Sequence, residues 1–113
     1  MSKSIGAQIF LSRFFRLIEA GRVVFQPRNA PKTRQFLLER DLGTDDVLEV
    51  LRELNAEECV SGPESDRDGT PGNVMIFHHR WGANLLYIKL KLWSDQLGDS
   101  GLVMSLHEEG KYD

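Results

Sequence analysis

Residues 85–93 alternate chemistry-bearing side chains with aliphatic ones, the pattern of a half-buried β-strand. One face of that strand is aliphatic and consists of Leu86, Ile88, Leu90 and Leu92. The opposite face then carries Tyr87, Lys89, Lys91 and Trp93. Because residues two apart lie roughly 6.5 to 7 Å from each other along one face, a phenol and two ammonium groups on flexible stems can converge on a single phosphate.

Residues 102–107 show the same alternation near the end of the chain. The period of two predicts that Leu102, Met104 and Leu106 enter the core, and that Val103, Ser105 and His107 point to the open side. If the two strands pair as a hairpin, one open face carries five polar side chains of interest. They are Tyr87, Lys89, Lys91, Ser105 and His107.

These residue types suit the cleavage of RNA without a metal ion. Attack by a ribose 2′-OH on the neighbouring phosphate needs a proton acceptor, a proton donor for the departing oxygen and fixed positive charge. Imidazole can serve as acid or base near neutral pH, lysine supplies charge, and a phenol donates a hydrogen bond or stacks on a base. We therefore predict His107, Tyr87 and Lys89 as catalytic residues, and Lys91, Ser105 and Arg67 as RNA-binding residues.

Two other interpretations of these residues stay open. Lysines are common on solvated sheet faces, so the same face can belong to a module that binds RNA or a protein without cutting it. Arg67 lies between Asp66 and Asp68, and such a loop arginine is often tied to its acidic neighbours. His78 and His79 are adjacent in an expected strand and point to opposite faces, so they do not form a shared metal site. We expect no metal and no cofactor.

Helices in the first half of the chain must position this face. Apolar residues recur every three or four positions in residues 5–20, and further helical patterns cover 31–40 and 44–54. Residues 61–72 are rich in Gly, Pro, Ser and Asp and read as a loop. Strands are then expected at 73–79, 84–93 and 101–107, and residues 22–26 are expected to form a short strand or an extended connector. The pattern predicts an α+β fold in which N-terminal helices pack on one face of a small antiparallel sheet.

Composition fits one domain spanning residues 1–113, since the chain is 41% hydrophobic and 27% charged. No apolar run approaches the ~20 residues that cross a bilayer, and the single cysteine, Cys59, excludes an internal disulfide. We expect a cytoplasmic protein that does not enter a membrane. The charge is uneven: residues 1–40 hold eight basic and two acidic residues, whereas residues 41–70 hold two basic and ten acidic residues. The basic part can attract a polyanion although the net charge is −3.

The sequence also resembles the MqsR-type toxins of bacterial toxin–antitoxin pairs. The resemblance extends over about residues 9–109 and rests on residues 11–23 (LSRFFRLIEAGRV), 41–43 (DLG), 86–92 (LYIKLKL) and 102–107 (LVMSLH), in that order. It implies a RelE-like fold, an endoribonuclease that acts on messenger RNA, and a cognate antitoxin protein as partner. The tyrosine of the family's strand falls on Tyr87, and the basic residue of its last strand falls on His107.

Overall fold

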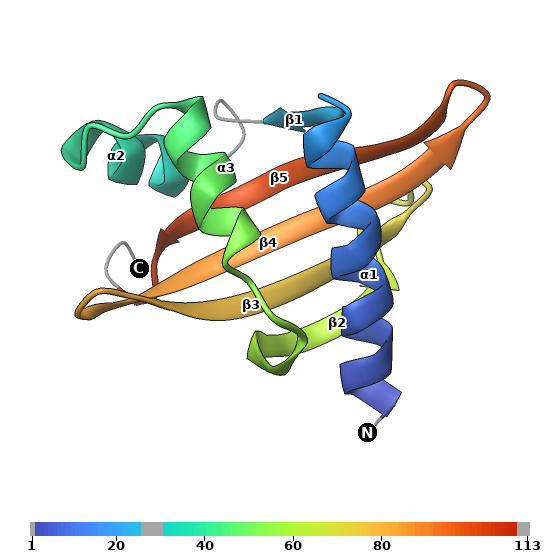
Figure 1. Ribbon diagram of the computed structural model, residues 1–113, viewed down its shortest axis with the longest axis horizontal. Helices are drawn as coiled ribbons and strands as arrows, with labels where there is room; N and C mark the ends of the chain where they lie inside the picture. Colours follow the sequence, from blue (N-terminus) through green and yellow to red (C-terminus); the bar gives the residue numbers. More distant parts are fainter. Residues whose placement is uncertain (1, 26–30, 111–113) are drawn as a thin grey trace.

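The computed structural model describes residues 2–25 and 31–110 of the chain. Three α-helices, α1 (Ser2–Glu19), α2 (Pro31–Glu39) and α3 (Thr44–Arg52), precede a short 3-10 helix, η2 (Ala56–Glu58). The strands are β1 (Val23–Phe25), β2 (Cys59–Ser65), β3 (Asn73–Trp81), β4 (Asn84–Asp95) and β5 (Gly98–Glu108). The helices α1 and α3 lie across one face of the sheet, so the predicted α+β fold is confirmed (Figure 1). None of the helices in the described residues is both long and apolar enough to cross a bilayer.

The sheet contains five strands in the order β1-β5-β4-β3-β2. The strands β3, β4 and β5 pair antiparallel as expected, β2 adds a further antiparallel strand beside β3, and β1 runs parallel to β5, so the sheet is mixed. The prediction of a loop over 61–72 is wrong for its first part, because β2 extends to Ser65 and pairs with β3. Turn-forming residues such as Gly62 and Pro63 concealed this strand, which is held by its partner and not by its own propensity.

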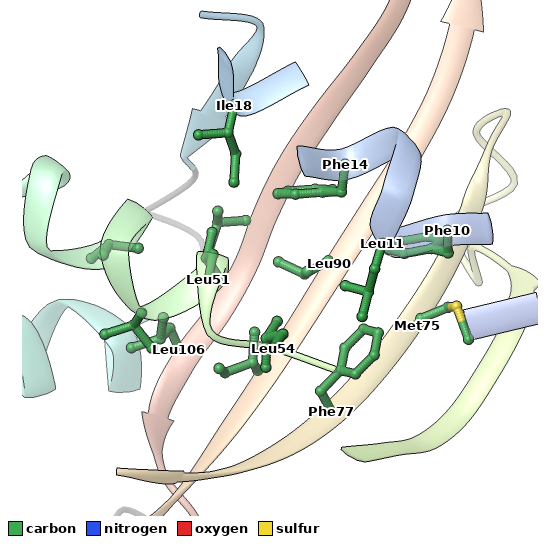
Figure 2. Packing of buried hydrophobic residues seen from close by; sticks show 14 of the residues in the cluster. Phe10, Leu11, Phe14, Ile18, Leu51, Leu54, Met75, Phe77, Leu90 and Leu106 are labelled. Carbon is green, nitrogen blue, oxygen red and sulfur yellow. The ribbon is translucent and has the colours of Figure 1, made fainter. Parts of the chain in front are cut away.

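The core lies between α1, α3 and the aliphatic face of the sheet. Phe10 and Phe14 of α1 stack with ring centroids 6.2 Å apart, and Phe10 lies 6.3 Å from Phe77 of β3 (Figure 2). Leu90 of β4 is fully buried in this cluster. The helix α1 approaches β5 so closely that a Cβ at Gly101 would sit 2.9 Å from the Phe14 ring. Leu86, Ile88, Leu90 and Leu92 are all buried here, as their alternation predicted.

The alternation in β5 is interrupted by a β-bulge. Lys89 pairs with Ser105 and the next residue, Leu90, pairs with Val103, so Met104 is an extra residue. Leu106 enters the core as predicted, but the assignments of Met104 and Val103 are wrong, and Leu102 is buried outside the core cluster, on the opposite face of the sheet. Val103 belongs to the core, while Leu102 and Met104 line a hollow on the open face. Because of the extra residue, the strand residues before Met104 point to the face opposite to the one that strict alternation predicts.

Candidate functional site

The open face of the sheet brings the predicted catalytic side chains together. In the antiparallel pairing of β4 and β5, Tyr87 lies opposite His107 and Lys89 lies opposite Ser105. Residues directly opposite in such a pair share a face, and Leu106, between them in sequence, is in the core. The structure therefore places Tyr87, Lys89, Ser105 and His107 as two adjacent cross-strand pairs, on the face opposite α1 and α3.

Three rings form a row across the middle of this face. The ring of Tyr87 stacks on that of His107, with centroids 5.2 Å apart and planes inclined by 20°. On its other side, the Tyr87 centroid lies 6.2 Å from that of His78, which is opposite Tyr87 in β3. The Nε2 atom of His78 is 3.2 Å from the Glu109 carboxylate. Two imidazoles thus flank one phenol, each from a neighbouring strand.

His107 is held in a defined orientation. Its Nδ1 lies 3.0 Å from the backbone carbonyl of Glu108, and because a carbonyl only accepts, Nδ1 carries a proton and donates it there. In the neutral ring, Nε2 is then the basic nitrogen. His107 lies on the expected face but is only 8% exposed, so the expectation of an uncovered side chain is wrong. The stacked Tyr87 ring is one cause of this burial.

Tyr87 is suited to donate a hydrogen bond. Burial raises the pKa of its phenol, and the negative charge of Glu109 raises this pKa further. Lys32 and Arg67 act in the opposite direction but do not cancel the increase. The phenol therefore keeps its proton at neutral pH, so Tyr87 is a donor or a stacking platform and not a base.

Tyr87, Lys89 and Arg67 line one hollow of about 190 Å³. The walls of this hollow come from β2, β3, β4 and the segment that joins β2 to β3, and they include Glu64, Val74 and Ile76. Among the described residues, neither Lys89 nor Arg67 forms an ion pair, so the expectation that acidic neighbours tie Arg67 down does not describe the structure. Two positive charges beside a phenol can bind one phosphate.

Lys91 does not offer its charge to a ligand, in contrast to its predicted role in RNA binding. Its side chain is 8% exposed, its Nζ lies 2.7 Å from an oxygen of Asp66, and it also donates to the Thr70 hydroxyl. The ammonium thereby fastens the β2–β3 connection onto β4. We leave Lys91 out of the RNA-binding set for this reason, while Ser105 and Arg67 remain in it.

The Asp66–Lys91 pair should make the stability of the chain depend on pH. The hydrogen bond from Lys91 lowers the pKa of Asp66, and the backbone N–H of Asp68 adds to this effect. The stability contributed by a carboxyl with a lowered pKa is complete above about pH 4, the ordinary Asp value, and is lost as the pH falls through the folded pKa. We expect Asp66→Asn to be less stable than the wild type at pH 6 and the gap to narrow near pH 2.5, as measured by urea unfolding. An equal gap at both pH values would show that the ion pair contributes nothing.

Two residues at the site were missed by the sequence analysis. Glu64 lines the hollow with Tyr87 and Lys89, but it was placed in a loop because β2 was not recognised. His78 was considered only as a metal ligand. Pairing the strands at 73–79 and 84–93 as a hairpin could have predicted that His78 lies opposite Tyr87, beside the phenol. His79 points to the opposite face, where its ring nitrogens lie 2.8 Å from Glu58 and 3.1 Å from Glu53. Within the described residues, no group of three His, Cys, Asp or Glu could hold a metal ion.

Comparison with known proteins gives no further assignment. No family model, no curated protein and no solved structure matches the chain. The class defined by the structure is an α+β protein with helices on one face of a five-stranded, largely antiparallel sheet and a cluster of polar and aromatic residues on the other.

Proposed function

We propose that this protein is the toxin of a type II toxin–antitoxin pair, an endoribonuclease of the MqsR type with a RelE-like fold that cleaves messenger RNA without a metal ion. One observation carries the proposal: Tyr87 and Lys89 lie beside His107 on the sheet face opposite α1 and α3, and Arg67 lines the same hollow as the first two. The arrangement of N-terminal helices on a largely antiparallel sheet supports the α+β part of the fold that the resemblance implies.

The proposed reaction is an attack by the ribose 2′-OH on the adjacent phosphorus. The bond between phosphorus and the 2′ oxygen forms while the bond to the 5′ oxygen breaks, leaving a 2′,3′-cyclic phosphate and a 5′-hydroxyl. His107 accepts the 2′ proton, and His78 protonates the departing oxygen. In-line displacement puts the attacking and leaving oxygens on opposite sides of phosphorus, which suits two imidazoles that flank Tyr87.

The charged transition state is stabilised by groups at the hollow beside Tyr87. The pentacoordinate phosphorus carries more negative charge on its oxygens than the substrate does, so fixed positive charge accelerates the reaction. Lys89 and Arg67 provide this charge, and Tyr87 donates a hydrogen bond to a phosphate oxygen. Ser105, opposite Lys89, extends the polar surface for the sugar–phosphate chain.

A second function is favoured by the low exposure of His107. A proton acceptor must reach its substrate, and a side chain that is 8% exposed offers little surface for contact. The alternative is a non-enzymatic module that binds RNA, or a protein, with the same face. Purified protein that binds RNA but leaves it intact for hours, after removal of any partner, would support this alternative.

Lys89 and Lys91 form a matched pair that tests where RNA binds. Lys89→Gln should weaken RNA binding and make the slope of log affinity against log salt concentration shallower by about one, because Lys89 has no acidic partner among the described residues. Lys91→Gln should leave the affinity close to that of the wild type and instead lower the melting temperature, because Asp66 already neutralises this ammonium. Anisotropy of a labelled oligonucleotide over a salt series measures both. A larger loss of affinity in Lys91→Gln would contradict the assignment.

The proposed function includes a cognate antitoxin as protein partner and a cytoplasmic location. A partner of this kind could add a strand to an open sheet edge, but the structure occupies the outer edge of β5. The strand β1 pairs with residues 101–103 of β5, and the Thr33 hydroxyl of α2 accepts the N–H of Leu106. Strand addition at these positions of β5 is therefore blocked, and we propose that an acidic antitoxin segment binds the basic N-terminal third instead. A short helix-turn-helix reading frame beside this one would be the genomic sign of that partner.

A further inference from the structure

A second, larger hollow lies on the same sheet face, further along β4. Its volume is about 310 Å³, within the range of small-molecule sites. Trp93, Leu102 and Met104 give it an apolar surface, and Asp68, Thr70 and Lys91 add polar atoms. Nothing in the mechanism proposed above uses this hollow.

The bulge in β5 is what builds the apolar part of this hollow. If β5 paired with β4 in strict alternation, without the bulge, Leu102 would enter the core with Leu106. The bulge instead turns Leu102 to the open face opposite Lys91, and Met104 lies beside it in the hollow. Bulges commonly re-aim side chains next to binding sites. Apolar side chains are thereby placed on a face that is otherwise polar near Tyr87.

The wall opposite this apolar surface is held firmly by the β2–β3 connection. Lys91 binds Asp66 and Thr70, and Asp68 accepts both the backbone N–H and the hydroxyl of Thr70. Gly72 has a φ of +122°, and a Cβ there would lie 2.5 Å from the Leu92 carbonyl and 2.9 Å from the Trp93 Cβ. Only glycine allows the chain to approach β4 so closely. The hollow is therefore preformed.

The position of the hollow suits a strand of RNA that passes over Tyr87. Tyr87 and Trp93 lie on one face of β4, six residues and so roughly 20 Å apart, a distance that a few nucleotides of single strand can cover. Asp66 borders both hollows, so the two are neighbours. Single-stranded RNA is read by stacking its bases on aromatic rings and by hydrogen bonds to their edges. The larger hollow offers an indole for stacking and the Asp68 carboxylate as an acceptor.

We propose, on the basis of the RNA-cutting function above, that this hollow is a base-recognition subsite. Trp93 stacks on an RNA base a few nucleotides from the cleaved bond, and Leu102 and Met104 support that base from the sheet. Asp68 accepts a hydrogen bond from an exocyclic amino group, so adenine, cytosine and guanine are preferred over uracil, which has no such group. The subsite thus selects where the chain cuts and takes no part in the reaction itself.

Trp93 fluorescence tests the binding step directly. In a Trp81→Phe background, Trp93 is the only indole, since the chain has two tryptophans. Titration with AMP, CMP and GMP should quench its emission, and UMP should quench it less. Asp68→Asn should reduce the difference between CMP and UMP. The absence of quenching by all four nucleotides, or equal quenching by all four with no effect of Asp68→Asn, would overturn the inference.

Cleavage mapping separates this inference from the proposed function. On a mixed-sequence RNA, Trp93→Ala should weaken binding about 5- to 150-fold, equivalent to the ~1–3 kcal/mol of base stacking, and should broaden the set of sites that are cut. Trp93→Phe, which retains a stacking ring, should cut the wild-type sites. If the wild type cuts RNA and Trp93→Ala cuts the same sites at the same relative rates, the subsite is wrong and the function stands. If the wild type leaves RNA uncut while nucleotides quench Trp93, the function is wrong and the subsite stands.

Discussion

His107→Ala should cleave RNA at least about 10²-fold more slowly than the wild type, because a positioned acid or base typically contributes ~10²- to 10⁴-fold in rate. The Nδ1 proton is donated to the Glu108 carbonyl, so Nε2 is the nitrogen to which the proposed mechanism assigns the 2′ proton. Removal of the ring deletes this acceptor and also the stacking partner of Tyr87. Single-turnover cleavage of a labelled RNA by the two purified proteins measures the effect.

The control for this experiment must address the burial of His107. Since the side chain is 8% exposed, part of any loss in His107→Ala can come from local rearrangement around Tyr87. His107→Gln keeps much of the volume and a polar end but has no titratable nitrogen. We expect His107→Gln to be as slow as His107→Ala while unfolding at a urea concentration close to that of the wild type. A His107→Gln variant that cuts at the wild-type rate would remove His107 from the mechanism.

Leu90→Ala should lower the free energy of unfolding by about 2–5 kcal/mol, the range for a buried leucine replaced by alanine. Leu90 is fully buried on the face covered by helices and lies in the cluster with Phe14 and Met75 (Figure 2). The variant loses the contacts of the removed atoms, and the cavity that they leave adds a further cost. Urea unfolding followed by circular dichroism gives the value.

Leu38→Ala is the matched control for the core variant. Leu38 carries the same side chain but is 76% exposed on α2, so its truncation should change the free energy of unfolding by less than about 0.5 kcal/mol. Comparable losses in the two variants would mean that the core does not lie on the face of β4 that contains Leu90. The conclusion that Tyr87 and Lys89 lie on the open face would then be wrong.

Local patterns in the sequence were sufficient to predict the face of β4. Four aliphatic residues at a period of two are buried together only when they share one face of a sheet. This predicted that Tyr87 and Lys89 lie on the opposite face. The hairpin with β5 then placed His107 beside Tyr87, because neighbouring strands with a short connection pair with each other. This part of the site depends on residues that are close in the chain.

The features that were not predicted depend on contacts between distant residues. Lys91 is neutralised by Asp66, 25 positions earlier, and no local pattern links the two. The strand β2 exists because β3 offers it a partner, although its own residues favour turns. Residues 102–107 alternate regularly in the sequence, so the bulge at Met104 could not be predicted from them. The larger hollow, which depends on this bulge, could not be predicted either.

The most direct test of the proposed function uses one RNA and one modified copy of it, each incubated with the purified wild-type protein in EDTA. The first is an RNA that the protein cuts, and the second carries a 2′-deoxyribose at the nucleotide on the 5′ side of the cleaved bond. We expect the RNA to be cut with a 2′,3′-cyclic phosphate end and the deoxy-substituted copy to stay intact at that position, because the 2′-OH is the nucleophile. An RNA that is bound but uncut in EDTA, or a substituted copy cut at the same rate as the RNA, would contradict the mechanism.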